Sequence, residues 1–224
     1  MRRAFFVTGT DTGVGKTTVA CALLAAARAR GLTALGHKPV ESGCAVTTDG
    51  ALLPEDALRL ARAAGRDQPP GRVLALRAPL APAVAAELEG VTIDLTALLL
   101  DARAVLACAA DLTLVEGAGG LRVPLSEHAE IRELVSALEL PLLVIARDGL
   151  GTINHTLLTI EAAHARGIPV AGVVLNGVHP GTPAQDIARN AQEIARRSGG
   201  VRVLGTAPHG TPPVVDEILD ALLA

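Results

Sequence analysis

A chain of 224 residues, of which 50% are hydrophobic, can bury a large core, and we expect residues 1–224 to form a single domain. The formal net charge is −3 and no basic run occurs, which removes the usual electrostatic basis for binding nucleic acid. Three scattered cysteines indicate neither a disulfide framework nor a metal site, and no apolar stretch reaches the ~20 residues of a membrane span, so we expect a cytoplasmic protein without membrane contacts.

The first predicted unit is a strand, a glycine loop and a helix. Residues 5–7 are apolar and suit a buried strand, residues 9–15 read "GTDTGVG", and residues 17–30 have an alanine-rich helical pattern. A glycine loop at a helix N-terminus is typical of a phosphate site, because backbone N–H groups there attract anions. Lys16 adds a positive charge, and the hydroxyl of Thr17 can hold Mg²⁺.

The loop is one residue longer than the generic P-loop pattern. That pattern has four residues between its first glycine and the Gly-Lys-Thr, whereas five residues separate Gly9 from Gly15. A flexible turn that binds nothing is the alternative, but the strand before the loop and the helix after it favour a phosphate-binding loop.

The rest of the chain alternates predicted strands and helices. We expect strands at residues 32–40, 72–79, 112–117, 140–146, 169–177 and 201–205, and helices at residues 55–64, 95–109, 151–167, 182–200 and 212–224. This alternation predicts an α/β fold of the P-loop NTPase type, with a doubly wound, mainly parallel sheet and helices on both faces. Ligands in such folds bind beyond the carboxyl ends of the strands, so polar residues that follow apolar runs are the candidates for a site.

Lys38 and Ser42 lie at the end of the second predicted strand. A lysine at a strand end is more often solvated than functional. Near a phosphate loop, however, a second cation can neutralise charge that develops when a phosphoryl group is transferred.

The segment "LTLVEGAGG" places an acid and three glycines after another apolar run. Glu116 has the position of a Walker B acid, which reaches Mg²⁺ directly or through water, and the glycines let the backbone approach a ligand. A loop-capping Glu116 is the alternative. Asp56, at the start of a predicted helix, is a weaker candidate because acids are favoured there for capping alone.

Asn176 follows the apolar run "VAGVVL". Its amide has both a donor and an acceptor, which suits the edge of an adenine ring. Asn-Gly is also a strong turn signal, so the residues alone leave both functions open.

The segments "VTGTDTGVGKT", "HKPVESG", "VEGAGG", "GLGTINHTLLT" and "VVLNGV" resemble, in this order, the motifs of the dethiobiotin synthetase family. The resemblance covers most of the chain, and the extra loop residue is one that this family carries. It implies a ligase that uses Mg²⁺ and ATP. In that family, 7,8-diaminononanoate takes up CO₂ as a carbamate, the carbamate attacks the γ-phosphate of ATP, and the second amine closes the ring to give dethiobiotin, ADP and phosphate.

The resemblance also implies residue roles. Lys16 would bind the β- and γ-phosphates, Lys38 would be the catalytic lysine, and Mg²⁺ would be held by Thr17, Asp56 and Glu116. The alignment is loose around Asp56, and Glu55 or Asp49 are substitutes for it. The ATP-binding residues would be Gly13, Val14, Gly15, Lys16, Thr17, Thr18, Asp56, Glu116, Gly117, Ala118, Gly119, Asn176, Gly177, Pro208, His209 and Gly210. Some family members carry an acid where this chain has Gly13, so only the backbone N–H remains there.

The diamine would be bound by Thr12, Ser42, Leu150 and Asn154. From the residues alone, 152–165 is an amphipathic helix with Asn154 near its start, where a solvated polar turn is the ordinary interpretation. In the family this stretch lies at a two-fold interface and reaches the neighbouring subunit's site. The resemblance therefore implies a homodimer in which Lys38 of one chain and Asn154 of the other serve one site.

Other nucleotide-binding classes fit less well. A partition or nitrogenase-reductase-like ATPase has a signature lysine five residues before the P-loop lysine, and that position is Asp11 here. A cobyrinate-type amide synthase normally carries a glutaminase domain, for which no residues remain. A catalytically dead nucleotide-binding module predicts loss of Lys38 or Glu116, and both are present.

Overall fold

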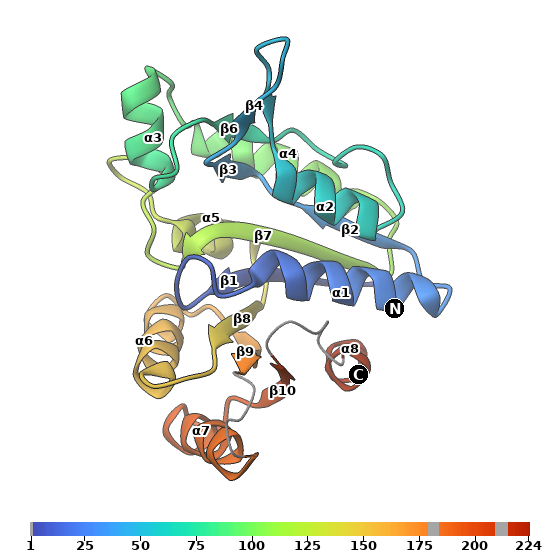
Figure 1. Cartoon of the computed structure of the whole chain (residues 1–224), viewed down its shortest axis with the longest axis vertical. Coiled ribbons are helices and arrows are strands. Elements are labelled where there is room, and N and C mark those ends of the chain that lie inside the picture. The colour runs from blue at the N-terminus through green and yellow to red at the C-terminus, as the bar shows by residue number, and fades with distance from the viewer. Residues whose placement is uncertain (1, 179–183, 209–214) are drawn as a thin grey trace.

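The computed structural model describes residues 2–178, 184–208 and 215–224. Strands and helices alternate along these ranges as the sequence predicts (Figure 1). The elements are β1 (Arg3–Gly9), α1 (Lys16–Ala29), β2 (Ala34–His37), β3 (Val40–Ser42), β4 (Ala45–Val46), β5 (Leu52–Leu53), α2 (Glu55–Ala63), β6 (Leu74–Leu76), α3 (Pro82–Glu89), α4 (Leu95–Ala107), β7 (Leu112–Gly120), α5 (Ile131–Leu138), β8 (Leu142–Arg147), α6 (Thr152–His164), β9 (Val170–Val178), α7 (Ala184–Arg197), β10 (Val203–Pro208) and α8 (Asp216–Leu223).

A six-stranded sheet with the order β10-β9-β8-β1-β7-β2 runs through the described ranges. Its neighbouring strands pair in parallel, and β1 lies in the middle between β7 and β8, where Phe6 is in register with Val115 and Leu142. Parallel neighbours need crossover connections, which the helices supply. The predicted α/β fold with a doubly wound parallel sheet is confirmed.

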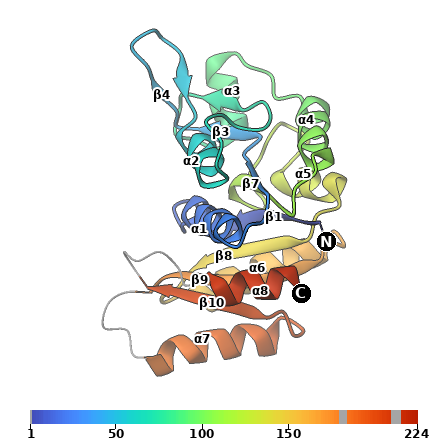
Figure 2. The ribbon, with the colours of Figure 1, turned by 90° about the vertical axis from the view of Figure 1, so that its right-hand side faces the viewer.

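The two faces of the sheet are covered by different helices. Successive residues of β1 alternate between them: Phe5 and Val7 pack with the buried residues of α1, α2 and α8, and Phe6 packs with those of α4, α5, α6 and α7. Figure 2 shows α1 and α2 on one side of the central strands and α4 and α5 on the other. Because both faces are buried, the central strands read as continuous apolar runs.

Five features differ from the elements expected from the sequence. The strand expected at residues 32–40 is divided into β2, in the main sheet, and β3, outside it. The strand expected at residues 72–79 is only the short β6, and it pairs with β3 in a separate two-stranded sheet, outside the main one. A small antiparallel hairpin, β4–β5, follows β3. The helices α3 and α5 are additional. In α5, Glu130 and Glu133 form a capping box at the N-terminus, which fixes the start of a helix of only eight residues.

The sheet topology brings the candidate residues to one edge. The glycine loop follows β1, Lys38 follows β2, and Glu116 lies in β7 opposite Val7 of β1. Because β2, β7 and β1 are parallel neighbours, their carboxyl ends meet at the same edge. Within the described ranges, none of the helices combines the length and apolar character needed to cross a membrane.

Candidate active site

The loop after β1 leads into α1 through a left-handed glycine. Gly15 has φ +93°, and a Cβ at this position would collide with the side-chain amide of Asn176, so only glycine fits. The first turn of α1 contains no acidic residue, and its described neighbours provide no side-chain cap. The N–H groups at the start of α1 therefore suit an anion such as a phosphate.

Lys16 is the first residue of α1 and is nearly buried. Its Nζ lies 3.3 Å from the carbonyl oxygen of Asp11 in the loop. Burial lowers the pKa of Lys16, and the repulsion from Lys38 acts in the same direction, against the attraction of Glu116 and Asp56. The ammonium gains from an anionic partner, which a phosphate supplies.

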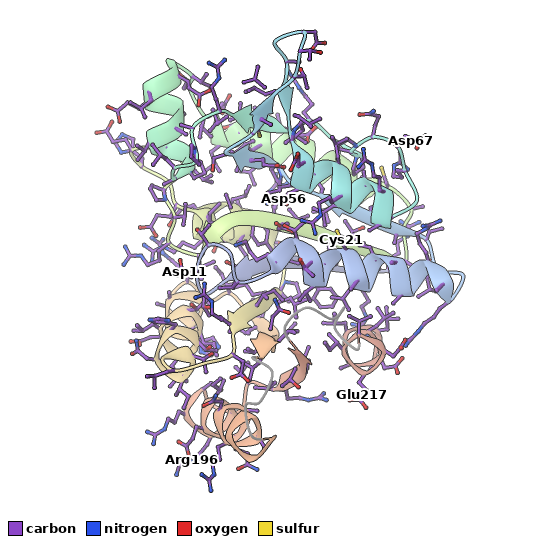
Figure 3. The ribbon with its side chains drawn as sticks, in the orientation of Figure 1. Asp11, Cys21, Asp56, Asp67, Arg196 and Glu217 are labelled. Atoms are coloured by element: carbon purple, nitrogen blue, oxygen red, sulfur yellow. The ribbon has the colours of Figure 1, made fainter. Side chains whose placement is uncertain are left out.

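Lys38 connects the second strand with two acids from other elements. Its Nζ lies 2.6 Å from Oε1 of Glu116 and 2.8 Å from Oδ2 of Asp56, at the start of α2. Figure 3 shows Asp56 between α2 and β7, and Asp11 in the loop before α1. Burial opposes the charge of Lys38, but the two carboxylates outweigh it and raise its pKa. The raised pKa favours the charged ammonium form of Lys38 at neutral pH.

Glu116 is completely buried, and one of its carboxylate oxygen atoms accepts two hydrogen bonds. Its Oε1 accepts hydrogen bonds from the hydroxyl of Thr17, at 2.8 Å, and from Lys38. Asp56 is more exposed: burial alone would raise its pKa, but the charge and hydrogen bond of Lys38 lower it overall. Both contacts of Glu116 cross between elements, from β7 to α1 and to the segment after β2.

The donors at this point fit Mg²⁺. Oε2 of Glu116 is buried and has no hydrogen-bond partner among the described residues, which leaves one carboxylate oxygen available to a ligand. Thr17 and Asp56 add further oxygen atoms near Lys38. The described part of the chain contains no group of three or more His, Cys, Asp or Glu side chains arranged for a metal. Two carboxylates and a hydroxyl are instead typical of Mg²⁺ that shares its coordination with substrate phosphates.

A cavity of about 350 Å³ opens at this edge of the sheet and is lined by most of the predicted residues. Those that line it are Thr12, Gly13, Gly15, Lys16, Thr17, Thr18, Lys38, Ser42, Asp56, Glu116, Ala118 and Gly119. Of the three acids considered near residue 56, only Asp56 lines this cavity; Glu55 is exposed, and Asp49 caps the turn between β4 and β5.

Other predicted residues lie outside this lining. Val14 is buried, and its carbonyl oxygen accepts a hydrogen bond of 2.8 Å from Nδ2 of Asn176. Gly117 lies against the ring of Phe6, where a Cβ would come within 2.8 Å. Gly177 has φ +79° and a Cβ there would meet open space. Asn176 and Gly177 nevertheless both lie inside β9, so Asn-Gly does not form the turn that the sequence left open.

Leu150 and Asn154, the residues predicted to serve the neighbouring subunit, are exposed at the start of α6. Among the described residues, neither lines the cavity of its own chain. Pro208 ends β10, so the backbone of the last predicted nucleotide loop begins at the sheet. His209 and Gly210 lie outside the described residues.

Two lining residues were not assigned a function from the sequence, Glu41 and Arg59. Glu41 is buried and binds the start of α2, whereas Arg59 lies 3.4 Å from Oδ1 of Asp56. Arg59 follows Asp56 by three residues in a helix, a spacing that predicts contact. No sequence spacing connects Glu41 with α2, since a hairpin separates them.

Comparisons with known proteins agree on the family. A family model described as "AAA domain" matches residues 3–212. A protein of Anaeromyxobacter dehalogenans strain 2CP-C, named ATP-dependent dethiobiotin synthetase BioD, is 50% identical over 196 residues, which are 87% of this chain and 85% of that protein. A protein of the same name from Aromatoleum aromaticum is 43% identical over 209 residues, 92% of this chain and 91% of that protein.

Solved structures confirm the fold at low sequence identity. The signal recognition particle 54 kDa protein from Aeropyrum pernix K1, in complex with GDP, aligns with a TM-score of 0.58 at 19% identity, over 99% of this chain and 46% of that one. Chloroplast FtsY from Physcomitrella patens aligns with a TM-score of 0.53 at 16% identity, over 100% of this chain and 66% of that one.

Proposed function

The chain belongs to the dethiobiotin synthetase family, and on this premise we propose how its own residues carry out the reaction. It is an ATP-dependent ligase of biotin biosynthesis that closes a ureido ring on 7,8-diaminononanoate with CO₂. The observation that carries the proposed mechanism is the cluster at the cavity, in which Lys38, Glu116 and Thr17 lie in direct contact next to the phosphate-type loop.

We propose that Lys16 binds the β- and γ-phosphates of ATP and that Lys38 stabilises the phosphoryl group as it is transferred. One amine of the substrate, with CO₂, forms a carbamate and loses a proton. A carbamate oxygen then attacks the γ-phosphorus and ADP leaves. The second amine attacks the carbonyl carbon of the resulting mixed anhydride, phosphate leaves with its oxygen, the amine loses a proton, and the ring closes. Such chemistry needs positioning and charge neutralisation more than a general base, which fits a Lys38 whose pKa is raised by Glu116 and Asp56.

Thr17, Asp56 and Glu116 are proposed to hold Mg²⁺. When bound, the ion supplies neutralising charge at the phosphate oxygens of ATP. The proposal is supported by the unpartnered, buried Oε2 of Glu116 and by the position of Asp56 at the cavity.

The remaining assignments are proposals of the same kind. Thr12 and Ser42, which line the cavity, would contact the diamine or its carbamate. The backbone of the loop and of the β7 glycines would contact the phosphates, and Asn176 with the segment after β10 would contact the base. We further propose that residues 1–224 act as one domain in the cytoplasm.

We also propose a homodimer with sites shared across the interface. Leu150 and Asn154 would reach the carboxylate end of the diamine in the partner's site. Their exposure supports this, because a residue that serves another chain has to face outward in its own.

The decisive experiment is to incubate the protein with ATP, Mg²⁺, bicarbonate and 7,8-diaminononanoate and to detect dethiobiotin by mass. ATP hydrolysis is expected to depend on the diamine, since without a carbamate no nucleophile is in line with the γ-phosphate. Vigorous hydrolysis without the diamine, stimulated by DNA or a protein partner, would point to a partition-type ATPase instead.

A further inference from the structure

We propose that Glu41, a residue outside the proposed set of catalytic and metal-binding groups, is a positioning residue that holds Asp56 in place for Mg²⁺. Glu41 lies in β3, is buried and lines the same cavity. Its Oε1 accepts the backbone N–H of Asp56 at 2.9 Å, and its Oε2 accepts that of Ala57 at 3.0 Å. This inference rests on the proposed metal-binding role of Asp56.

Glu41 replaces a cap that α2 cannot make for itself. The residue before α2 is Pro54, and none of the described residues next to it caps the helix with a side chain of its own. The N–H groups of the second and third helical residues are those that an N-cap side chain normally binds. In α2 these two groups belong to Asp56 and Ala57, and both donate to Glu41 from a different strand.

The hydrogen bonds of Glu41 complete a closed chain of contacts around the proposed metal site. Lys38 and Glu41 are three residues apart in the chain, Glu41 holds the backbone of Asp56, and the carboxylate of Asp56 returns to Nζ of Lys38. The hairpin β4–β5 lies between Glu41 and α2 in the chain. Each of its strands has only two residues, so the hairpin does not by itself fix where α2 starts. The clamp by Glu41 sets that start, and with it the position of the Asp56 side chain.

A bidentate clamp also explains why a carboxylate is buried at this point. Burial and the charge of Asp56 raise the pKa of Glu41 overall, while the two backbone N–H groups and Lys38 oppose this and favour its charged form. A negative charge at a helix N-terminus is favourable. The carboxylate of Glu41 binds only backbone N–H groups, so it does not occupy an oxygen atom of the Asp56 side chain. Both oxygen atoms of Asp56 remain directed at Lys38 and Arg59.

The chain contains a matched control. Asp94 caps α4 in the same way, since its Oδ1 accepts the N–H groups of Thr96 and Ala97, which are again the second and third helical residues. Asp94 is exposed and does not line the cavity in the described structure. Loss of Asp94 removes a helix cap only, whereas loss of Glu41 removes a cap and, by this proposal, the placement of Asp56.

The test compares Glu41→Ala, Glu41→Gln and Asp94→Ala in the full chain. Two quantities are measured: the Mg²⁺ concentration for half-maximal dethiobiotin formation, and the shift in melting temperature that ADP causes with Mg²⁺ and with EDTA. In Glu41→Ala we expect the required Mg²⁺ concentration to rise by about tenfold or more, as for other residues that orient metal ligands. The additional melting shift due to Mg²⁺ is lost, while the shift by ADP in EDTA stays. Glu41→Gln, which keeps one acceptor, lies between Glu41→Ala and the wild type.

Asp94→Ala is expected to lower the melting temperature and to keep the wild-type Mg²⁺ dependence. If Glu41→Ala behaves in the same way, with a Mg²⁺ requirement within about twofold of the wild type, Glu41 is only a helix cap and the proposal is wrong. Should Glu41→Ala not fold, the same comparison with Glu41→Gln decides. If the wild type forms no dethiobiotin, the proposed function fails, and the Mg²⁺-dependent melting shift still tests Glu41.

Discussion

The ammonium of Lys38 lies 2.6 Å from Oε1 of Glu116, and both side chains are buried. Removing one partner of a buried ion pair leaves the other charge without compensation, at a cost of about 3–5 kcal/mol. The hydrogen bond from Thr17 offsets part of this at Glu116. A substitution of Lys38 therefore changes stability as well as catalysis, and each kinetic measurement on it needs a melting curve beside it.

Alanine substitutions of Lys16 and Lys38 are expected to impair different steps of the reaction. Lys38→Ala should lower kcat by on the order of 10²-fold or more and change nucleotide affinity little, because its charge matters most as the phosphoryl group moves. Lys16→Ala should weaken nucleotide binding as well as turnover. Steady-state kinetics and calorimetric titration with ADP distinguish the two. A folded Lys38→Ala protein with turnover within about twofold of the wild type would exclude its catalytic role.

Acid is expected to destabilise the protein through His37. Burial lowers the pKa of this histidine from 6.5 to about 4, against the opposing attraction of Asp101, whose Oδ2 lies 3.3 Å from Nε2. Between these pH values the unfolded chain binds a proton that the folded chain does not, so the free energy of unfolding falls as the pH drops from about 6.5 to about 4. The loss is at most on the order of 3 kcal/mol.

Urea denaturation at several pH values between 7 and 4, as an experimental range, measures this loss. His37→Gln should flatten the dependence over this range, while the exposed His128, replaced by Gln as the control, should leave it unchanged. An unaltered slope in His37→Gln would assign the acid sensitivity to other groups, such as the carboxylates around Lys38.

Two glycines of the loop are expected to tolerate alanine differently. Gly13 and Gly15 both have positive φ, but a Cβ at Gly13 meets open space and one at Gly15 collides with the amide of Asn176. Gly13→Ala carries only backbone strain and should weaken ADP binding by about tenfold. Gly15→Ala should weaken it by about 100-fold or more, because Asn176 must also move.

Calorimetric titration with ADP measures both variants. Because Asn176 is itself proposed to contact the base, the double variant Gly15→Ala/Asn176→Ala is compared with Asn176→Ala alone. Without the collision, Gly15→Ala should reduce the affinity less in this background than in the wild type. Equal losses in Gly13→Ala and Gly15→Ala would mean that the contact with Asn176 does not matter for the loop.

Mixed dimers test whether sites are shared. In a mixture of Lys38→Ala and Asn154→Ala chains, each mixed dimer would have one doubly damaged site and one intact site. Random reassortment makes about half of the dimers mixed, so about a quarter of all sites should regain wild-type activity. If the mixture shows only the average of the two variants, despite demonstrated subunit exchange, Asn154 serves its own chain or the solvent.

Local patterns predicted most of the central sheet and its helices. The runs 142–146 and 170–175 are apolar because both faces of β8 and of the centre of β9 are buried, and this signal is strong. The pattern of α5 was present as well: Ile131, Leu134, Val135 and Leu138 are spaced as one helical face and follow a capping box. By contrast, α3 is short and alanine-rich, so it has no clear apolar stripe in the sequence. The pairing of β6 with β3 could not be predicted either, because strand pairing is not encoded locally.

The site was predictable as residue types but not as contacts. The contact between Thr17 and Glu116 joins positions 99 residues apart, and the one between Asn176 and Val14 joins positions 162 apart. Hydrophobic periodicity carries no information about contacts between positions so far apart. Only the resemblance to a family indicated that these residues belong to one site. The role of Glu41 has no local sequence signal for the same reason, since its hydrogen bonds reach α2 across the hairpin β4–β5.

The central place of β1 in the sheet has a consequence for synthesis on the ribosome. The strand leaves the ribosome well before its neighbours β7 and β8, which begin only at Leu112 and Leu142. The loop that follows β1 therefore has no sheet to anchor it until well over half of the chain has been translated. Long-range parallel pairing of this kind is slow and leaves apolar strands exposed in the nascent chain. We expect ATP binding to appear only in translation products that extend beyond β8, so nucleotide retention by stalled chains of increasing length would mark the step at which the sheet closes.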